Sequence, residues 1–275
     1  MWFKKWVLER QTYQTLSRDS GLSRDTLQRI FYAFLDKAPE VVINKWQDIH
    51  LRLDATYFKK FCVICYQDND IGYTQLYRFS RAELYDEIKE DLMNLLKLGL
   101  SVKSITCDGH KATLKAIKKV MPKVTIQRCL VHIQRMSLIW LTRHPRSIAG
   151  KELRAIVLMM NKIKTNNDKI QWTRELYHWY KLHDAYLKEK SINTLNGKYW
   201  YKHKFLRRSY FSINRALPNM FHYLEDIDIP KSTNGIESFF GHLKNHLDLH
   251  RGLTPEHRKG FIKWYFYLKN QVSFV

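Results

Sequence analysis

The sequence has few cysteines, no long apolar run and few acidic residues for its 275 residues. Only one Cys-x-x-Cys unit occurs, Cys62 and Cys65, and a second unit that would complete a zinc site is missing. We therefore predict reduced core cysteines in a cytoplasmic protein. No run of about 18 apolar residues occurs, so no membrane span is expected. The charged first ten residues do not form a signal peptide.

Basic residues far outnumber acidic ones. The 47 lysines and arginines against 26 acidic residues give a formal net charge of +21 and a pI near 9.8. Nucleic acid is the commonest polyanionic partner for such a chain. An anionic membrane surface is the rival partner, but no basic amphipathic helix stands out as an anchor. Hydrophobic residues make up 45% of the sequence, which is enough for a folded core.

Asp54 is the first carboxylate in an unusual position. Leu51 and Leu53 alternate with Arg52, and residues 61–66 form a second β-rich run, so the pattern predicts a β-hairpin. Burying a carboxylate in a strand is costly unless a cation holds it, and hard divalent ions prefer such oxygens. The alternative is an edge-strand aspartate that faces water.

Two further carboxylates follow in order. Asp108 ends a predicted strand over residues 102–107 and precedes a helix, where sites on open α/β sheets form. Its alternative role is to cap that helix. Glu237 lies near a helix start, and its alternative is a capping box with Asn234 as the cap. Together, Asp54, Asp108 and Glu237 on so basic a chain suggest one metal site.

Residues 1–40 have the pattern of a helix-turn-helix. Gly21 suits the turn, and Ser23 suits the cap of a second helix. Four apolar residues supply the core spacing: Leu16, Leu22, Leu27 and Ile30. Arg24, Gln28 and Arg29 on the second helix would then face DNA. The alternative is an ordinary helical hairpin with a solvated polar face.

Residues 46–132 are expected to form the main sheet, in the order β-β-β-α-β-α-β. Three strands in succession, followed by strands that alternate with helices, predict one mixed sheet in an α/β fold. Cys129 and His132 follow the last strand and are one helical turn apart, so their side chains can share a face. A core cysteine beside a satisfied histidine is the competing interpretation.

Residues 133–230 look all helical and are rich in basic and aromatic side chains. Within residues 198–208 cations alternate with flat rings, a composition that suits nucleic-acid binding. The candidate contacts are Lys198, Trp200, Lys202, Lys204, Arg207 and Arg208. The alternative is a helix with an aromatic core stripe and a wet cationic face. Residues 231–275 would return to the core as helices that carry Glu237.

This ordered set resembles the DDE transposases of bacterial insertion sequences, in the Mutator-like superfamily. Four motifs carry the resemblance: Leu53-Asp54-Ala55-Thr56-Tyr57, Cys107-Asp108-Gly109-His110, Arg128-Cys129-Leu130-Val131-His132 and Thr233-Asn234-Gly235-Ile236-Glu237-Ser238. The resemblance implies an RNase H-like core with a helical insertion. It implies that Asp54, Asp108 and Glu237 are the catalytic residues and metal ligands, with Cys129 and His132 near the site.

Such a site would bind two divalent ions, Mg²⁺ or Mn²⁺, for in-line attack on a phosphodiester. Four bases near these motifs could neutralise the scissile phosphate: His110, Lys111, His242 and Lys244. General surface charge is their alternative role. The expected partner is double-stranded DNA, bound by a homodimer or larger assembly in the bacterial nucleoid, without a membrane. An RNase H-like nuclease and a non-catalytic DNA-binding derivative are the competing functions.

Overall fold

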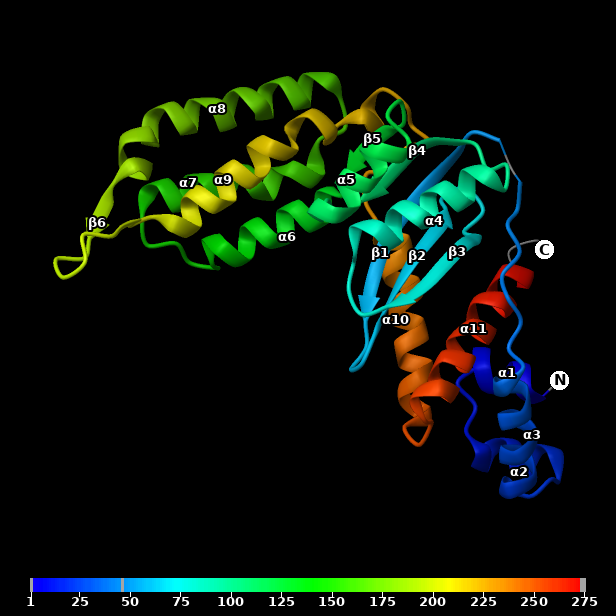
Figure 1. Cartoon of the computed structure of the whole chain (residues 1–275). Helices are drawn as coiled ribbons and strands as arrows, with labels where there is room; N and C mark the ends of the chain where they lie inside the picture. Colours follow the sequence, from blue (N-terminus) through cyan, green and yellow to red (C-terminus); the bar gives the residue numbers. More distant parts are fainter. Residues whose placement is uncertain (1, 46, 273–275) are drawn as a thin grey trace. The chain divides into compact units, whose positions relative to one another are not determined.

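The computed structural model describes residues 2–45 and 47–272, which divide into two compact units. Within these residues the first unit runs as far as Ile105, resumes over His110–Val124 and resumes again from Thr233 onward. The second unit comprises Thr106–Gly109 and Thr125–Ser232. Figure 1 shows the elements of both units along the chain.

The main sheet has five strands in the order β3-β2-β1-β4-β5. The strands are β1 (Ile49–Tyr57), β2 (Cys62–Asp68), β3 (Thr74–Ser80), β4 (Val102–Cys107) and β5 (Thr125–Arg128). Helix α4 (Tyr85–Lys97) connects β3 to β4, and α5 (Lys111–Val120) connects β4 to β5. The predicted order of strands and helices is therefore confirmed, as is the α/β class with a mixed sheet.

The register between β1 and β2 determines which side chains share a face. The two strands are antiparallel, with Leu53 opposite Tyr66 and Asp54 opposite Cys65. Opposed residues in an antiparallel pair point to the same side of the sheet. Tyr66 donates a hydrogen bond to Asp91 of α4, whereas Cys65 belongs to the apolar core shared with α10 and α11. Asp54 therefore points to the face that α10 and α11 cover.

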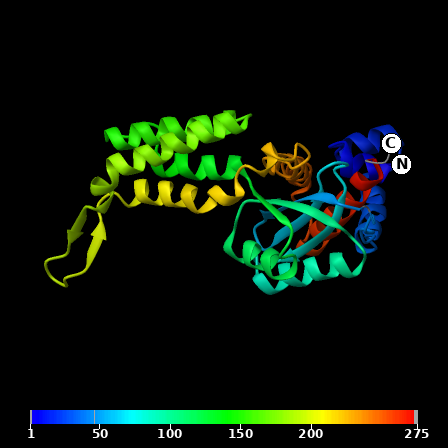
Figure 2. The ribbon, with the colours of Figure 1, turned by 90° about the horizontal axis from the view of Figure 1, so that it is seen from above.

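The N-terminal helices share that core rather than forming one of their own. They are α1 (Trp2–Leu8), α2 (Tyr13–Ser20) and α3 (Arg24–Asp36), and they pack with α10 (Asn234–Leu247) and α11 (Pro255–Val272). Trp6 is fully buried there and contacts Phe31 and Phe261. Figures 1 and 2 show α1–α3 beside α11, with α4 and α5 on the opposite face of the sheet.

The turn between α2 and α3 follows the sequence prediction closely. Gly21 has a left-handed φ of 71°, and the Ser23 side chain accepts a hydrogen bond from the backbone N–H of Thr26 at 3.1 Å. The prediction about core residues is only half right. Leu16 and Leu27 are buried, but Leu22 and Ile30 are each 38% exposed, because they lie on the faces of the hairpin turned away from Trp6 and Phe31.

The second unit contains a bundle of four helices with its own core. The helices are α6 (Leu130–Leu141), α7 (Ile148–Met159), α8 (Asn166–Lys188) and α9 (Lys204–Ala216). Trp172 and Trp179 are buried in that core, and their indole N–H groups donate to the carbonyls of Ile156 and Ala149. Three single-turn 3₁₀ helices follow α7 and α9: η1 (Met160–Lys162), η2 (Leu217–Asn219) and η3 (His222–Leu224).

The expectation that residues 133–230 are all helical is wrong at one place. Strands β6 (Lys190–Ile192) and β7 (Tyr199–Tyr201) form an antiparallel hairpin between α8 and α9. Figure 2 shows this hairpin projecting from the end of the four helices. Gly197 has a left-handed φ of 66° in the connecting turn, and the three consecutive aromatic residues of β7 favour a strand over a helix there.

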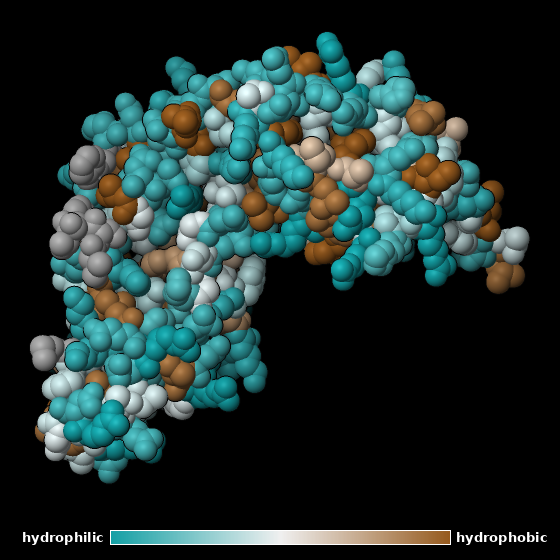
Figure 3. All heavy atoms as spheres, turned by 180° about the vertical axis from the view of Figure 1, so that it is seen from behind, coloured by the Kyte–Doolittle hydropathy of each residue, from teal (hydrophilic) through white to brown (hydrophobic). Residues whose placement is uncertain are grey.

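The remaining global predictions concern cysteines and membranes. All four cysteines are free and buried, as expected for core residues. Within the described part of the chain, no helix combines the length and apolar character that crossing a bilayer requires. The face drawn in Figure 3 is mainly hydrophilic, with apolar side chains in small separate patches.

Candidate functional site

Asp54 lies in the interior of the sheet rather than at its edge. Strand β1 has β2 on one side and β4 on the other, and Asp54 is half-buried. Its carboxylate accepts a hydrogen bond from the N–H of Ala55 at 2.9 Å. The alternative of an edge-strand aspartate in open water is therefore wrong.

Glu237 lies in the first turn of α10, which packs against β1 within the same unit. The helix begins at Asn234 with Thr233 in the N-cap position. Asn234 is thus a helical residue, and the capping-box alternative with Asn234 as the cap is wrong. The Thr233 hydroxyl lies 3.5 Å from the Glu237 carboxylate, and Glu237 is half-buried.

The guanidinium of Arg52 bridges β1 and α10. A Cβ atom added at Gly235 would lie 2.2 Å from Arg52 Nη1, so only glycine allows this approach. Burial lowers the Arg52 pKa, against the opposing effects of Asp70 and Asp68, and its Nε has no hydrogen-bond partner among the described residues. Arg52 precedes Asp54 by two residues, and Gly235 precedes Glu237 by two. One guanidinium therefore lies near both of the chain segments that carry these carboxylates.

The second unit repeats this arrangement around Asp108. The Arg128 guanidinium donates from Nη2 to the Asp108 carbonyl at 2.9 Å. A Cβ added at Gly109 would lie 1.8 Å from Arg128 Cζ, and Gly109 also has a left-handed φ of 89°. Helix α5 begins at Lys111 with His110 at its N-cap, so Asp108 is not the helix cap that the alternative required.

Cys129 and His132 lie beside this segment in the second unit. The Cys129 N–H donates to the carbonyl of Cys107 at 2.8 Å, which joins the end of β4 to the start of α6. Cys129 is fully buried and His132 is half-buried, and Cys129 Sγ and a His132 ring nitrogen lie within 4.8 Å of each other. The predicted shared face is therefore present.

The sequence did not single out Glu83, a largely covered carboxylate of the first unit. Its side chain is only 11% exposed. Tyr57 and Thr113 donate hydrogen bonds to it at 3.2 and 3.4 Å, and His110 Nδ1 lies 3.7 Å away. Burial, followed by the charge of Glu83, raises the Tyr57 pKa to about 12. Since Glu83 follows β3 in an irregular segment, no periodic pattern marked it.

The other three predicted phosphate-neutralising bases belong to the first unit. Lys111 and His242 are exposed, so both side chains are accessible to a ligand. Lys244 is half-buried, and its Nζ lies 5.6 Å from the centre of the Phe58 ring. That position gives Lys244 a local packing role beside the residues that follow β1.

The three predicted DNA contacts of α3 do not share one environment. Arg24 and Gln28 line a pocket together with Tyr32, one stripe along the helix at intervals of four residues. Arg29 is exposed and lies off this stripe. The pocket is closed by residues 249–253, which the sequence had not connected with α3.

The candidate contacts around the β6–β7 hairpin also differ in exposure. Lys198, Trp200, Lys202, Lys204 and Arg208 are exposed, and Trp200 exposes 52% of its surface. Arg207 is half-buried instead. Its guanidinium carbon lies 3.7 Å from the centre of the Tyr201 ring, and Nη1 donates to the carbonyl of Leu187. Arg207 therefore holds the hairpin to the bundle.

Comparison with known proteins yields one family match over part of the chain. Residues 86–173 match the model of the family described as Transposase, Mutator family. The predicted Mutator-family assignment is thereby confirmed for this segment. The matched segment contains Asp108, Gly109, Arg128, Cys129 and His132. The match supports a transposase function. No curated protein matches the sequence.

Solved structures add little to this assignment. One similar chain belongs to the cryo-EM structure of a simian T-cell lymphotropic virus intasome in complex with PP2A regulatory subunit B56 gamma. The identity is 14%, the TM-score is 0.23, and the match covers 64% of this chain and 52% of that chain. This chain thus spans about half the length of that relative. A TM-score this low does not establish a common fold.

Proposed function

We propose that this chain is a DDE-type DNA transposase of a bacterial insertion sequence, which cleaves DNA and joins its ends to a target. The observation that carries the proposal is the Mutator-family match over residues 86–173, a segment that contains Asp108 and the Cys129–His132 pair. The α/β core with its mixed sheet, interrupted by a helical bundle before Glu237, fits an RNase H-like catalytic domain with an insertion.

Asp54, Asp108 and Glu237 are the proposed catalytic residues and metal ligands. The fit rests on the chemistry of the donors: all three are carboxylates, each is half-buried, and hard divalent cations prefer such oxygens. Mg²⁺ or Mn²⁺ is therefore the proposed cofactor. When bound, such ions supply an activated nucleophile and stabilise the leaving oxygen in an in-line displacement.

The protein's own groups position the acids and bind the phosphate. Arg52 against Gly235 fixes β1 and α10 side by side, so that Asp54 and Glu237 keep their spacing. Arg128 holds the backbone at Asp108 from its carbonyl side. His110, Lys111 and His242 are proposed to bind the phosphodiester as cations or hydrogen-bond donors, since charge-assisted bonds to phosphate are among the strongest. His110 would be oriented by the nearby Glu83 carboxylate.

DNA recognition is assigned to two elements. Helices α2 and α3 form the proposed helix-turn-helix, with Arg24, Gln28 and Arg29 as DNA contacts. The β6–β7 hairpin offers exposed Trp200 among lysines, a combination of stacking surface and charge that suits a nucleic-acid strand. A net charge of +21 supports a polyanionic partner. The proposed working form is a homodimer or larger assembly on double-stranded DNA in the nucleoid.

Two other functions compete with this one. A nuclease on the same core would cut DNA without joining it. A non-catalytic DNA-binding derivative would do neither, but it would have no use for three half-buried carboxylates in so basic a chain.

The deciding experiment incubates the purified chain with labelled element-end DNA and a target plasmid, with Mg²⁺ or Mn²⁺ and then with EDTA. Metal-dependent joined product is the expected result. Cleavage without joining would favour the nuclease, and DNA binding with neither reaction would favour the non-catalytic derivative.

A further inference from the structure

The first unit contains a pocket of about 370 Å³ that the proposed catalytic chemistry does not use. One wall comes from α2 and α3, and the other comes from the turn between α10 and α11, more than 200 residues later. Its volume lies in the range of small-ligand sites, which begins at roughly 300 Å³. The pocket thus joins the helix-turn-helix to the C-terminal part of the same unit.

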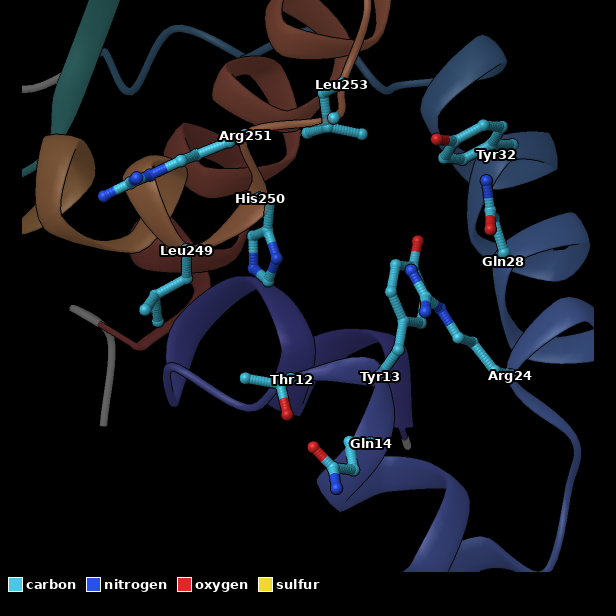
Figure 4. Close-up of a pocket in the computed structure, with 11 residues that line it drawn as sticks. Thr12, Tyr13, Gln14, Arg24, Gln28, Tyr32, Leu249, His250, Arg251 and Leu253 are labelled. Carbon is cyan, nitrogen blue, oxygen red and sulfur yellow. The ribbon is translucent and has the colours of Figure 1, made fainter.

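The lining combines polar, aromatic and two leucine side chains, and none of its residues is acidic. The residues that supply side chains are Thr12, Tyr13, Gln14, Arg24, Gln28, Tyr32, Leu249, His250, Arg251 and Leu253. Figure 4 shows Arg24, Gln28 and Tyr32 projecting from the same helix, α3, with the Arg24 side chain extending alongside Tyr13 of α2. An anionic ligand with hydrogen-bonding groups and a flat ring would match this lining.

Tyr13 is the most informative of these residues. Its ring stacks on Phe31 with centroids 5.6 Å apart, which fixes the side chain. Its hydroxyl is buried and has no hydrogen-bond partner among the described residues, and Figure 4 shows it pointing into the pocket. Burial raises the Tyr13 pKa, so the group is a neutral donor. A buried hydroxyl without a partner is costly, which is a reason to expect a ligand there.

The wall opposite α2 is built rigidly. Arg258 donates hydrogen bonds to the carbonyls of Arg251 and Leu253, which fixes the turn. His250 is buried against Trp6, with ring centroids 4.4 Å apart, and burial lowers its pKa to about 4. His250 is therefore a neutral aromatic wall at physiological pH, and the charge in the pocket comes from arginine.

From these contacts we propose that the pocket binds one nucleotide unit of a DNA strand, a unit that has left the duplex stack. Arg24 binds its phosphate, the Tyr13 hydroxyl and Gln28 bond the base edge, and the rings of Tyr32 and His250 flank the base. The pairing edge and the two flat faces of a base become accessible only when the base leaves the duplex. An intact duplex is too wide for this pocket. The proposal deepens the proposed DNA function and rests on it.

The test uses the full chain and a single-stranded DNA probe of mixed sequence that carries fluorescein and one 5-iododeoxyuridine. Ultraviolet cross-linking followed by peptide mass spectrometry should place the cross-link on Tyr13 or Tyr32. In anisotropy titrations, Tyr13→Phe and Gln28→Ala should each weaken single-strand binding about 3- to 10-fold.

Arg18→Ala is the matched control for Arg24→Ala, since both are exposed arginines of the helix pair α2–α3 and only Arg24 lines the pocket. Arg24→Ala should weaken single-strand binding about 10-fold, and Arg18→Ala less than twofold. Tyr13→Phe should not lower thermal stability, because it removes a hydroxyl that has no described partner. Cross-links confined to other segments, together with equal effects of the two arginine variants, would overturn the proposal.

A second arm separates a DNA strand from a free nucleotide. Deoxynucleoside monophosphates at millimolar concentration that protect Tyr32 from tyrosine modification, while DNA cross-links fall elsewhere, would support the nucleotide chemistry and overturn the DNA source. Strand transfer, measured in parallel, keeps the two proposals apart. Joining without the Tyr13 or Tyr32 cross-link would contradict only the pocket. The cross-link without joining would contradict only the transposase.

Discussion

Two arginines packed on glycines are the most informative residues around the proposed acids. Arg52 lies against Gly235 in the first unit, and Arg128 lies against Gly109 in the second. Each Nε is buried without a described hydrogen-bond partner. Native proteins leave few buried polar groups unpaired, so each such group calls for an explanation. Each pair adjoins a proposed catalytic carboxylate in the chain. We therefore interpret both arginines as positioning residues for the acids.

Gly109→Ala should slow strand transfer at a modest cost in stability. The new Cβ would force the Arg128 guanidinium away from the Asp108 carbonyl, and the left-handed φ adds about 1–2 kcal/mol of strain. Gly197→Ala is the matched control, because its φ is also left-handed and no atom lies within 4 Å of its added Cβ. Both variants should lose similar stability in denaturant unfolding, but only Gly109→Ala should lose at least tenfold in joining rate. Equal joining rates would contradict the role of Arg128.

His246 and His250 should make the first unit sensitive to mild acid. Burial lowers the pKa of both to about 4, below the unfolded value of about 6.5. The unfolded state therefore binds more protons, so stability is complete above pH 6.5 and is lost as the pH falls toward 4. At pH 5 the two histidines together should lower the free energy of unfolding by roughly 2–4 kcal/mol relative to pH 7.5.

The measurement is urea unfolding of the wild type and of the double variant His246→Gln/His250→Gln across this pH range. The variant should be less stable at pH 7.5 and should lose less stability on acidification. Asp68 and Asp91, whose pKa values burial raises, act in the opposite direction and remain in both proteins. A slope unchanged in the double variant would show that other groups titrate.

At the scale of elements, the contact between α3 and α11 connects the proposed helix-turn-helix to the core. A Cβ added at Gly260 of α11 would lie 2.4 Å from the backbone carbonyl oxygen of Leu35 in α3. Trp264 donates from its indole nitrogen to the carbonyl of Phe34 at 2.7 Å, and His257 lies 3.2 Å from the Asp36 carboxylate. The two helices are thus held together backbone to backbone.

Gly260→Ala should push the two helices apart and destabilise the unit by about 1–3 kcal/mol, the usual cost of overpacking. Gly241→Ala in α10 is its control, since nothing lies within 4 Å of the added Cβ. That variant should gain up to about 1 kcal/mol from helix propensity. Thermal unfolding measures both. A Gly260→Ala protein as stable as the wild type would show that α3 can shift freely on α11.

Elements with a strong period were predictable from the sequence, and short ones were not. The order of five strands and two connecting helices followed from alternation and helical spacing over residues 46–132. Strands β6 and β7 are three residues each, too short for a period to show. The dipeptide Asn196-Gly197, flanked by Ile192 and Tyr199, was the available hairpin signal.

The site was predictable only as a set of residue types. Asp54 and Asp108 drew attention because a carboxylate in or at the end of a buried strand is costly, and Glu237 because it completes an ordered set of three in a very basic chain. The contacts of Arg52 with Gly235 and of α3 with residues 249–253 join segments about 180 or more residues apart. No local pattern encodes such pairs, since they form only when the sheet and its helices pack.

At the scale of the whole molecule, the net positive charge and the three carboxylates contribute to different steps: the charge to DNA binding, and the carboxylates to the proposed reaction. A net charge of +21 attracts DNA wherever it is exposed, so DNA binding alone does not separate an enzyme from a binding protein. Affinity for duplex DNA should fall steeply with salt whichever function holds. Only the reaction of the phosphodiester depends on the three acids.

The most direct test of the account is therefore the rate of strand transfer by Asp54→Asn, Asp108→Asn and Glu237→Gln, each measured with its affinity for element-end DNA. Asp248→Asn, an exposed acid at the end of α10, is the control. We predict that each of the three loses at least about a thousandfold in joining rate while binding DNA as well as the wild type does, and that Asp248→Asn joins normally. Joining that persists in any of the three would contradict the assignment of that residue to the reaction.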